Sequence, residues 1–359
     1  MGTLRLLLSI SVVLAHAGPI FGLTFLDSNL AVESFFIISG FYMTLILHEK
    51  YAKSFSAYIL FITNRFLRIF PIYWVVLACT ALTLLGHGVI NSGHSTVVHG
   101  IYSYPMTNGS IAFLLFTNVF IFFQDLVMFM GMHPGTGELY LTTNFKEYTP
   151  QVNSFLLVPQ AWTIAIELMF YLIAPFLTRQ KISIIVLVGL ASLTIRYVLF
   201  KIGLSQDPWS HRFFFSEVVF FVLGILACKV YLSMRNNSIP KYLPPGLFIA
   251  IILSVVFFKF FPGPFRAGML LISVATSLPF IFLMSKDWVW DRKIGNLTYP
   301  LYISHILVTH WLSVIDVVEI SSLLVLCVSF VFSVILNTLI EERIEKFRLR
   351  RLTRANYIA

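Results

Sequence analysis

Apolar stretches of roughly 20 residues recur from one end of the chain to the other, with short polar segments between them. A helix of that length crosses the hydrocarbon core of a bilayer, which is about 30 Å thick. These stretches are apolar on every side, whereas the strands of a membrane β-barrel alternate between apolar and polar residues. The pattern therefore predicts an all-α membrane protein, a polytopic bundle of about ten transmembrane helices. The expected spans are 4–24, 30–48, 69–86, 156–177, 182–200, 213–232, 246–261, 267–285, 297–315 and 320–340.

The first stretch, at 4–18, reads "LRLLLSISVVLAHAG" and has two interpretations. A basic residue, an apolar run and an A-x-A-like triplet are typical of a secretory signal peptide, which is removed. As a retained membrane helix, the same residues place Arg5 at the inner end and His16 about 16 Å further along. A histidine within a membrane helix is costly and usually functional. Pro19 and the glycines on either side of it favour a kink or opening of the helix near His16.

One further apolar run, at 111–130, is interrupted by Asn118, Gln124 and Asp125, and counting it as a span would invert every later helix. Lysine and arginine accumulate on the cytoplasmic side of a membrane. If 111–130 does not cross and the amino terminus is inside, most of the 25 basic residues fall in cytoplasmic segments. We therefore expect ten spans with both termini in the cytoplasm.

The longest segment between expected spans, 87–155, is rich in Gly, Asn, Ser, Thr and His. We predict one transmembrane domain over 1–345, in which 87–155 forms an external cap and the apolar stretch 111–130 is non-spanning or re-entrant. A basic cytoplasmic tail is expected over 346–359. The histidines of the cap are separated by glycines in a spacing that does not resemble a metal site, and we expect no metal. The three cysteines fall inside apolar runs, which favours a packing role.

Composition supports the membrane assignment and narrows the search for chemistry. Hydrophobic residues make up 58% of the chain and charged residues 11%, whereas soluble domains average about 45–50% and about 25%. A net charge of +9 then describes a cytoplasmic face rather than a surface for nucleic acid. Candidate functional residues are the few polar ones at membrane depth. They are His16, Glu33, Arg65, Arg68, Glu167, Arg196, Asn296, Tyr299 and His305.

Three of these candidates also have ordinary explanations. Glu33 is a carboxylate near a helix start, where negative charge is favourable whatever its function. Arg65 and Arg68 are three residues apart and share a helical face. They fit either the basic flank of a membrane helix or a pair of guanidinium groups for phosphate. The adjacent pair Ser39 and Gly40 favours close packing of another helix.

Several motifs occur in a fixed order along the chain. Arg5 is followed after ten residues by His16, and then come "FFIISGF", "RFLRIFP", "WTIAIELMFY" and "IGNLTYPLYISH". This series resembles the acyltransferase-3 family of integral membrane O-acyltransferases, and the resemblance extends from residue 4 to about 345. It implies a single-domain enzyme that takes an acyl group, usually acetyl, from cytoplasmic acyl-CoA. The acceptor would be a hydroxyl of an outward-facing sugar or glycan, and the first apolar stretch would be retained.

The resemblance also implies roles for individual residues. His16, Arg5, Glu33 and Glu167 correspond to the catalytic residues. The acyl-CoA co-substrate would be bound by Arg65 and Arg68, together with Arg5. The family tryptophan falls on Trp162. Two family positions carry threonine here, Thr163 and Thr298, and both keep a hydroxyl group.

A hydroxyl group needs a general base to attack a thioester, and neutral imidazole is the usual one. We therefore expect His16 to act as the base in direct transfer, with Glu33 or Glu167 orienting its second nitrogen, while His305 has a structural role. The alternative is a secondary transporter or flippase in which buried His, Glu and Arg form a proton relay. In either case we expect a multi-pass protein of the plasma membrane, the inner membrane in bacteria, with the bilayer and no nucleic acid as partner. Lipopolysaccharide, exopolysaccharide, a glycolipid and a secreted metabolite all remain open as acceptors.

Overall fold

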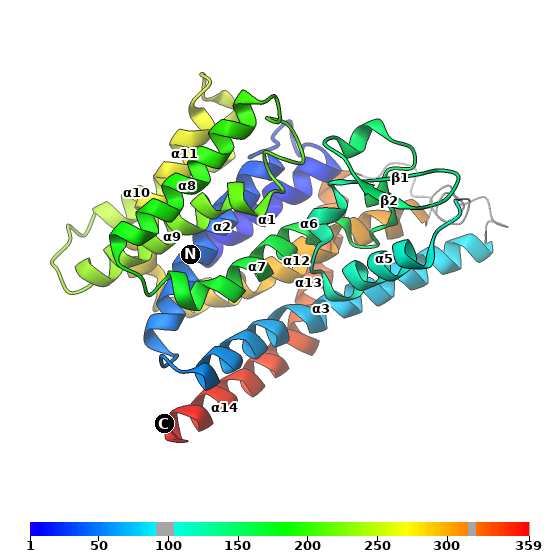
Figure 1. The fold of residues 1–359 in the computed structure, drawn as a ribbon. Coiled ribbons are helices and arrows are strands. Elements are labelled where there is room, and N and C mark those ends of the chain that lie inside the picture. The colour runs from blue at the N-terminus through cyan, green and yellow to red at the C-terminus, as the bar shows by residue number, and fades with distance from the viewer. Residues whose placement is uncertain (91–103, 315–320, 359) are drawn as a thin grey trace.

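The computed structural model describes residues 1–90, 104–314 and 321–358, and the chain is mostly helical over these ranges (Figure 1). The first three helices are α1 (Gly2–Ala17), α2 (Ser28–Glu49) and α3 (Phe55–Ile90). α1 is shorter than the expected span 4–24. It ends directly after His16 because Gly18 adopts φ 101° and is followed by proline. α3 begins before the expected span 69–86, so Arg65 and Arg68 lie inside a helix rather than in a loop.

The segment expected to form a cap contains short elements. They are α5 (Asn108–Phe120), α6 (Gln124–Val127), the antiparallel strands β1 (Met130–Met132) and β2 (Leu139–Leu141), and the single turns η1 (Phe145–Glu147), η2 (Val152–Phe155) and η3 (Pro159–Ala161). α5 stops because Ile121 and Phe123 adopt positive φ angles. Gln124 then folds back and donates to the carbonyl of Thr117 at 3.0 Å. A 13-residue helix extends about 20 Å, less than a bilayer core. This length favours a stretch 111–130 that does not cross.

A second group of helices follows. It comprises α7 (Trp162–Leu177), α8 (Ile182–Lys201), α9 (Phe214–Met234), α10 (Leu243–Val256), the turn η4 (Phe258–Phe260), α11 (Arg266–Ser285) and α12 (Val289–Val314). The chain ends in one continuous helical rod formed by α13 (Ser322–Leu336), a π-helical turn η5 (Asn337–Glu341) and α14 (Glu342–Ile358). α14 contains the basic tail expected over 346–359, and it packs beside α3 (Figure 1). Arg351 fixes this contact by donating to Asn64 at 3.0 Å and to Thr63 at 2.9 Å.

Seven helices among the described residues are long and apolar enough to cross a membrane. They are Ser28–Glu49, Phe55–Gly86, Pro159–Leu177, Ile182–Lys201, Phe214–Met234, Arg266–Ser285 and Ser322–Thr353. α1, α5 and α10 are apolar but shorter. The protein is therefore a helical, multi-pass membrane protein, as the apolar pattern predicted.

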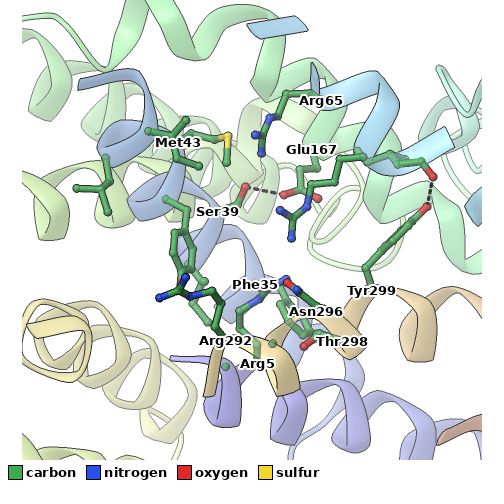
Figure 2. A pocket seen from close by; sticks show the side chains of 18 of the residues that line it. Arg5, Phe35, Ser39, Met43, Arg65, Glu167, Arg292, Asn296, Thr298 and Tyr299 are labelled. Carbon is green, nitrogen blue, oxygen red and sulfur yellow. Dashed lines mark hydrogen bonds between the residues drawn. The ribbon is translucent and has the colours of Figure 1, made fainter. Parts of the chain in front are cut away.

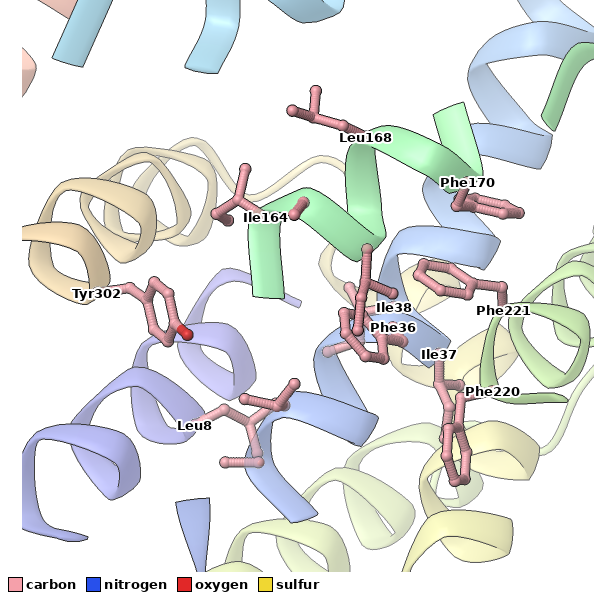
Figure 3. Packing of buried hydrophobic residues seen from close by; sticks show 14 of the residues in the cluster. Leu8, Phe36, Ile37, Ile38, Ile164, Leu168, Phe170, Phe220, Phe221 and Tyr302 are labelled. Carbon is pink, nitrogen blue, oxygen red and sulfur yellow. The ribbon is translucent and has the colours of Figure 1, made fainter. Parts of the chain in front are cut away.

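The core is built around α2, which packs against α9 without a gap (Figure 3). A Cβ added at Gly40 would lie 2.2 Å from the carbonyl oxygen of Phe221, and one at Gly224 would lie 1.9 Å from that of Ile37. Only glycine allows the two backbones to approach this closely. The close packing predicted for the Ser39–Gly40 pair is confirmed at Gly40. Phe36 and Phe221 stack in the same contact at a centroid distance of 4.7 Å.

Candidate functional site

A cavity of about 630 Å³, the inner cavity, penetrates the bundle from one end. It reaches residues at which helices begin or end, namely Gly2 of α1, Glu49 of α2 and Ser285 of α11, so it opens at that end of the bundle. Its wall along α2 extends from Glu49 to Val32, about 26 Å of helix. The shape therefore suits a long, extended ligand.

Basic side chains outnumber acidic ones on the wall of the inner cavity. Seven basic and four acidic residues line it. The basic residues are Arg5, Lys50, Arg65, Arg68, Lys286, Arg292 and Arg348, and the acidic residues are Glu49, Glu167, Asp291 and Glu345. Figure 2 shows Arg65 above the opening, with Arg5 and Arg292 below it. An excess of positive charge around a partly enclosed space favours an anionic ligand.

The three arginines singled out from the sequence meet in this cavity although they come from two helices. Arg5 belongs to α1, and Arg65 and Arg68 are one turn apart on α3. Within the described residues, none of these guanidinium groups has a carboxylate or carbonyl partner. Arg65 is only 4% exposed and its Nε is buried without an acceptor. Two of them lie over aromatic rings, Arg5 at 6.0 Å from Tyr42 and Arg65 at 5.6 Å from Phe61.

The carboxylate of Glu167 also faces the cavity and is held by two hydroxyl groups. Ser39 of α2 donates to Oε1 at 2.5 Å, and Tyr171 of α7 donates to the same oxygen at 2.6 Å. Figure 2 shows the Ser39 bond beneath Arg65. Ser39 thus has a second role beside the packing of its neighbour Gly40. Glu167 is fixed in one orientation by contacts within the bundle.

At its far end, the inner cavity is bounded by Tyr302 of α12 and Thr163 of α7. Their hydroxyl groups are 2.7 Å apart, and Tyr302 also donates to the carbonyl of Gln160 at 3.1 Å. The ring of Phe35 meets Tyr302 edge-on at 6.3 Å. The threonine that replaces the usual residue after Trp162 therefore uses its hydroxyl to fix the end of the cavity.

His16 does not line the inner cavity but lies beyond its far end. It is an exposed residue in the last turn of α1, and its ring is 5.1 Å from the ring of His305. His305 is buried, at 1% exposure, and its ring centroid is 6.1 Å from that of Tyr302. The two histidines form a pair, the outer histidine pair, that Tyr302 connects to the cavity.

Backbone carbonyl groups determine which nitrogen of each imidazole carries the proton. His16 Nδ1 is 2.8 Å from the carbonyl oxygen of Val12, and His305 Nδ1 is 2.6 Å from that of Tyr302. A carbonyl oxygen can only accept, so each neutral ring holds its proton on Nδ1 and keeps a lone pair on Nε2. Nε2 of His305 is buried without a partner among the described residues. Both histidines can therefore accept a proton at Nε2.

Glu33 belongs to a different cluster from the one expected. Arg196 of α8 donates to it at 3.1 Å, and His211 lies 3.8 Å from the same oxygen. Arg196 also lies 3.5 Å from Glu217, which is 1% exposed. Among the described residues, neither Glu33 nor Glu167 hydrogen-bonds to His16. The structure thus separates both carboxylates from the imidazole that they were expected to orient.

A second ion cluster joins the cap to the loop between α8 and α9. Asp207 is 2.6 Å from Arg212 and 3.2 Å from Lys146. Burial alone would raise the pKa of Asp207, but hydrogen bonds and charge from Arg212 and Lys146 outweigh it and lower that pKa. Arg212 lies 4.3 Å from the ring of Trp162. The cluster therefore holds the start of α7 against the cap.

The carboxy-terminal helix contributes cavity residues that the sequence did not indicate. Glu345, Arg348, Leu349 and Leu352 of α14 line the inner cavity. In the sequence, Arg348, Leu349 and Leu352 fall in the basic tail 346–359, which has the ordinary appearance of a cytoplasmic flank, and Glu345 directly precedes it. The only signal was the spacing of Glu345 and Arg348, which are three apart and 2.7 Å from each other. In the described parts of the chain, no three His, Cys, Asp or Glu side chains are grouped to hold a metal ion.

Comparison with known proteins covers nearly the whole chain. A family model described as an acyltransferase domain matches residues 2–342. A protein of Aquifex aeolicus (strain VF5) described as uncharacterized is 23% identical over 222 residues, which is 58% of this chain and 98% of that protein. No solved structure matches.

Proposed function

The chain belongs to the acyltransferase-3 family of membrane proteins, and on that premise we propose that it is an O-acyltransferase using acyl-CoA as donor. The acyl group, acetyl in the simplest case, passes to a hydroxyl group of a sugar or glycan on the outer side of the membrane. The observation that carries the proposal is the inner cavity. It is long, it is lined by Arg5, Arg65 and Arg68, which have no carboxylate partner in the described part of the chain, and it ends next to the outer histidine pair.

In the proposed mode of binding, the donor enters from the open end of the cavity. The phosphate groups of CoA meet the guanidinium groups of Arg65 and Arg68, which bind phosphate in a bidentate manner. Arg5 lies on α1 about 16 Å before His16 and binds the donor further along. The thiol arm extends toward Tyr302, and the acyl group passes this side chain to reach the histidines.

The chemical step is a direct transfer with His16 as general base. Nε2 of His16 takes the proton of the acceptor hydroxyl while that oxygen attacks the carbonyl carbon of the thioester. A carbon–oxygen ester bond forms, the carbon–sulfur bond breaks, and CoA leaves as a thiolate that regains the proton from the imidazolium. The hydrogen bond from Nδ1 to the carbonyl of Val12 supports this role because it directs the lone pair of Nε2 outward.

The two carboxylates have indirect roles in this proposal. Glu167 is fixed by Ser39 and Tyr171 on the cavity wall, where its negative charge partly balances the excess of basic side chains. Glu33 joins Arg196 and thereby fixes the start of α2 against α8. Both are positioning residues, since neither touches His16 among the described residues.

The direction of transfer rests on a topology of ten spans with both termini in the cytoplasm. Reporter fusions after residues 50, 236 and 290 should then give a cytoplasmic signal, and fusions within 87–155 an external one. An external signal at 236 would mean that 111–130 crosses, and the donor would enter from the wrong side. The protein is proposed to reside in the plasma membrane, which is the inner membrane in bacteria.

The activity is tested with purified protein in lipid nanodiscs, which cannot hold an ion gradient. We expect release of CoA from acetyl-CoA in the presence of a glycan extract and appearance of an ester on the glycan, detected by mass spectrometry. The matched sample is the His16→Gln protein. Movement of a glycolipid across vesicles without thioester cleavage would instead support a transporter and overturn the proposal.

A further inference from the structure

The carboxy-terminal helix α14 places an arginine in the inner cavity beside the pair on α3. Arg348 is 6% exposed, lines the cavity, and faces the wall that contains Arg65 and Arg68. α14 is held in this position by Arg351, one turn further on, whose bonds to Asn64 and Thr63 fix it to α3. The position of Arg348 is therefore a consequence of helix packing rather than of a flexible tail.

In the described ranges, only one nitrogen of the Arg348 guanidinium has a hydrogen-bond or ion-pair partner. Nη1 donates to Glu345 at 2.7 Å and lies 3.8 Å from Glu341. Nε is buried and has no acceptor among the described residues, and the same is true of Nε of Arg65. In a guanidinium group, Nε and Nη2 donate in parallel and match two oxygens of a phosphate. The edge of Arg348 left unpaired is thus the edge that binds phosphate best.

Buried donors without acceptors are rare in folded proteins, because leaving them unpaired costs free energy. Two such donors, on two different helices, both lie on the wall of one cavity. Glu345 and Glu341 both lie on the Nη1 side of Arg348, so its Nε edge keeps no acceptor among the described residues. The arrangement is a built anion site with contributions from α3 and α14.

We propose that Arg348 completes the donor site by binding a phosphate of the nucleotide end of CoA together with Arg65. This inference rests on the proposed function. The acyl end of the donor must point toward Tyr302, so the adenosine end remains at the open end of the cavity, where α14 contributes Arg348, Leu349 and Leu352. The carboxy-terminal helix is then part of the substrate site.

The experiment compares two donor fragments on purified protein in phosphatidylcholine nanodiscs, with affinities measured by calorimetry. CoA carries the full nucleotide, whereas 4′-phosphopantetheine carries the thiol arm and one phosphate without adenosine. We expect Arg348→Gln to weaken CoA binding roughly tenfold and to leave 4′-phosphopantetheine binding unchanged. Arg348→Lys keeps the charge but loses the parallel donors, and it should fall between the two.

The matched control is Arg350→Gln, which removes the same charge from an exposed position on the same helix. It should bind CoA as the unmodified protein does. Equal CoA affinity in the Arg348 variants and the unmodified protein would overturn the inference. So would a loss of affinity in Arg348→Gln that is the same for both fragments, because that pattern indicates a general disturbance of the cavity.

Anionic lipid is the other source of phosphate at this level of the bundle, and a second set of nanodiscs with phosphatidylglycerol distinguishes it. If Arg348 binds lipid, phosphatidylglycerol will weaken CoA binding in the unmodified protein but not in Arg348→Gln, and the two proteins will have equal affinity in phosphatidylcholine. That result overturns the inference. An unmodified protein that binds neither CoA nor 4′-phosphopantetheine contradicts the proposed donor itself, which is a different outcome.

Discussion

Charged side chains at one end of this bundle form complete ion pairs, whereas at the other end three arginines lack a carboxylate partner among the described residues, beside pairs such as Arg348 with Glu345. At the end that the proposed topology places outside, the outer end, Glu33 and Glu217 share Arg196, and Asp207 is paired with Arg212 and Lys146. At the inner end, the wall of the cavity contains arginines that have no carboxylate partner among the described residues. They are Arg5, Arg65 and Arg68.

This difference distinguishes charged residues that hold the helices together, the framework, from charged residues that bind a ligand. An ion pair that is complete within the protein stabilises one arrangement of helices, and removing one partner leaves an uncompensated charge. A buried cation without a carboxylate partner keeps an uncompensated charge, which favours a ligand of opposite charge. On this reasoning we propose that Glu33 belongs to the framework, although its family position suggested chemistry. The outer histidine pair is the exception at that end, because both Nε2 atoms remain available.

The largest expected effect concerns the histidines. His16→Gln keeps the size of the side chain but cannot accept a proton, so the rate of acyl transfer should fall by about 10²–10⁴-fold. Donor affinity should stay unchanged, because His16 does not line the inner cavity. The measurement is initial rate and CoA affinity on the same preparation. If His305→Gln abolishes turnover while His16→Gln does not, the base lies on α12 rather than on α1.

Breaking the outer ion pair should act on stability instead of on donor binding. Arg196→Gln leaves the buried carboxylates of Glu33 and Glu217 without their cation and should cost about 3 kcal/mol of unfolding free energy. The double variant with Glu33→Gln should recover part of that loss. Denaturant titration in detergent measures both. The control is Lys259→Gln, an exposed residue for which we expect no change. A weaker donor affinity in Arg196→Gln, with unchanged stability, would contradict the proposal that this end of the bundle stabilises the fold and does not bind the donor.

At the inner end, Arg65→Lys and Arg68→Lys should each weaken acyl-CoA binding roughly tenfold, because lysine cannot supply the two parallel donors. Stability should change little, since neither guanidinium has a carboxylate partner to lose among the described residues. Equilibrium binding and thermal unfolding of the same samples check both halves of the statement. Arg235→Lys, whose side chain pairs with Glu49 at the surface, is the control. Normal donor affinity in both variants would mean that Arg65 and Arg68 are only the basic flank of a membrane helix.

The smallest effect is the pH dependence of the Asp207 cluster. Its partners hold the pKa of Asp207 below the ordinary value of 3.8, so the stabilisation is present above that pH and disappears as the pH falls through the folded-state pKa. Asp207→Asn should therefore lower stability by about 1 kcal/mol at pH 7, and the difference should shrink below about pH 4. Unfolding midpoints from pH 7 to pH 3 test this. A difference that stays constant would show that Asp207 acts through packing alone.

The local features of this molecule could be predicted from the sequence because they depend on residues close together in the chain. The three-residue spacing of Arg65 and Arg68 predicted a shared face, and Gly40 predicted the close approach of another helix. The end of α1 was expected to be irregular near Pro19, although the helix stops there rather than bending.

Pairings between distant residues could not be predicted in the same way. Glu33 and Arg196 are 163 positions apart, and either one alone fits an ordinary helix end. Arg348 lies in a segment with many charges and few apolar residues, and its role on the cavity wall depends on the packing of α14 against α3. The early start of α3 could not be predicted for the same reason. Its first turns are stabilised by helices that come much later in the chain.

The continuity of α1 has a consequence for which donors the protein can use. An unbroken helix from Gly2 to Ala17 fixes the separation of Arg5 and His16 at about 16 Å, and a hydrogen-bonded helix hardly stretches. In the proposed reaction, α1 thus fixes the distance between the anchored end of a donor and its reacting carbon. In the proposed reaction, a small activated acetyl thioester is rejected for lack of reach, however reactive it is. A single residue inserted between Arg5 and His16 would increase their separation by only about 1.5 Å but would turn the imidazole by about 100° around the helix axis.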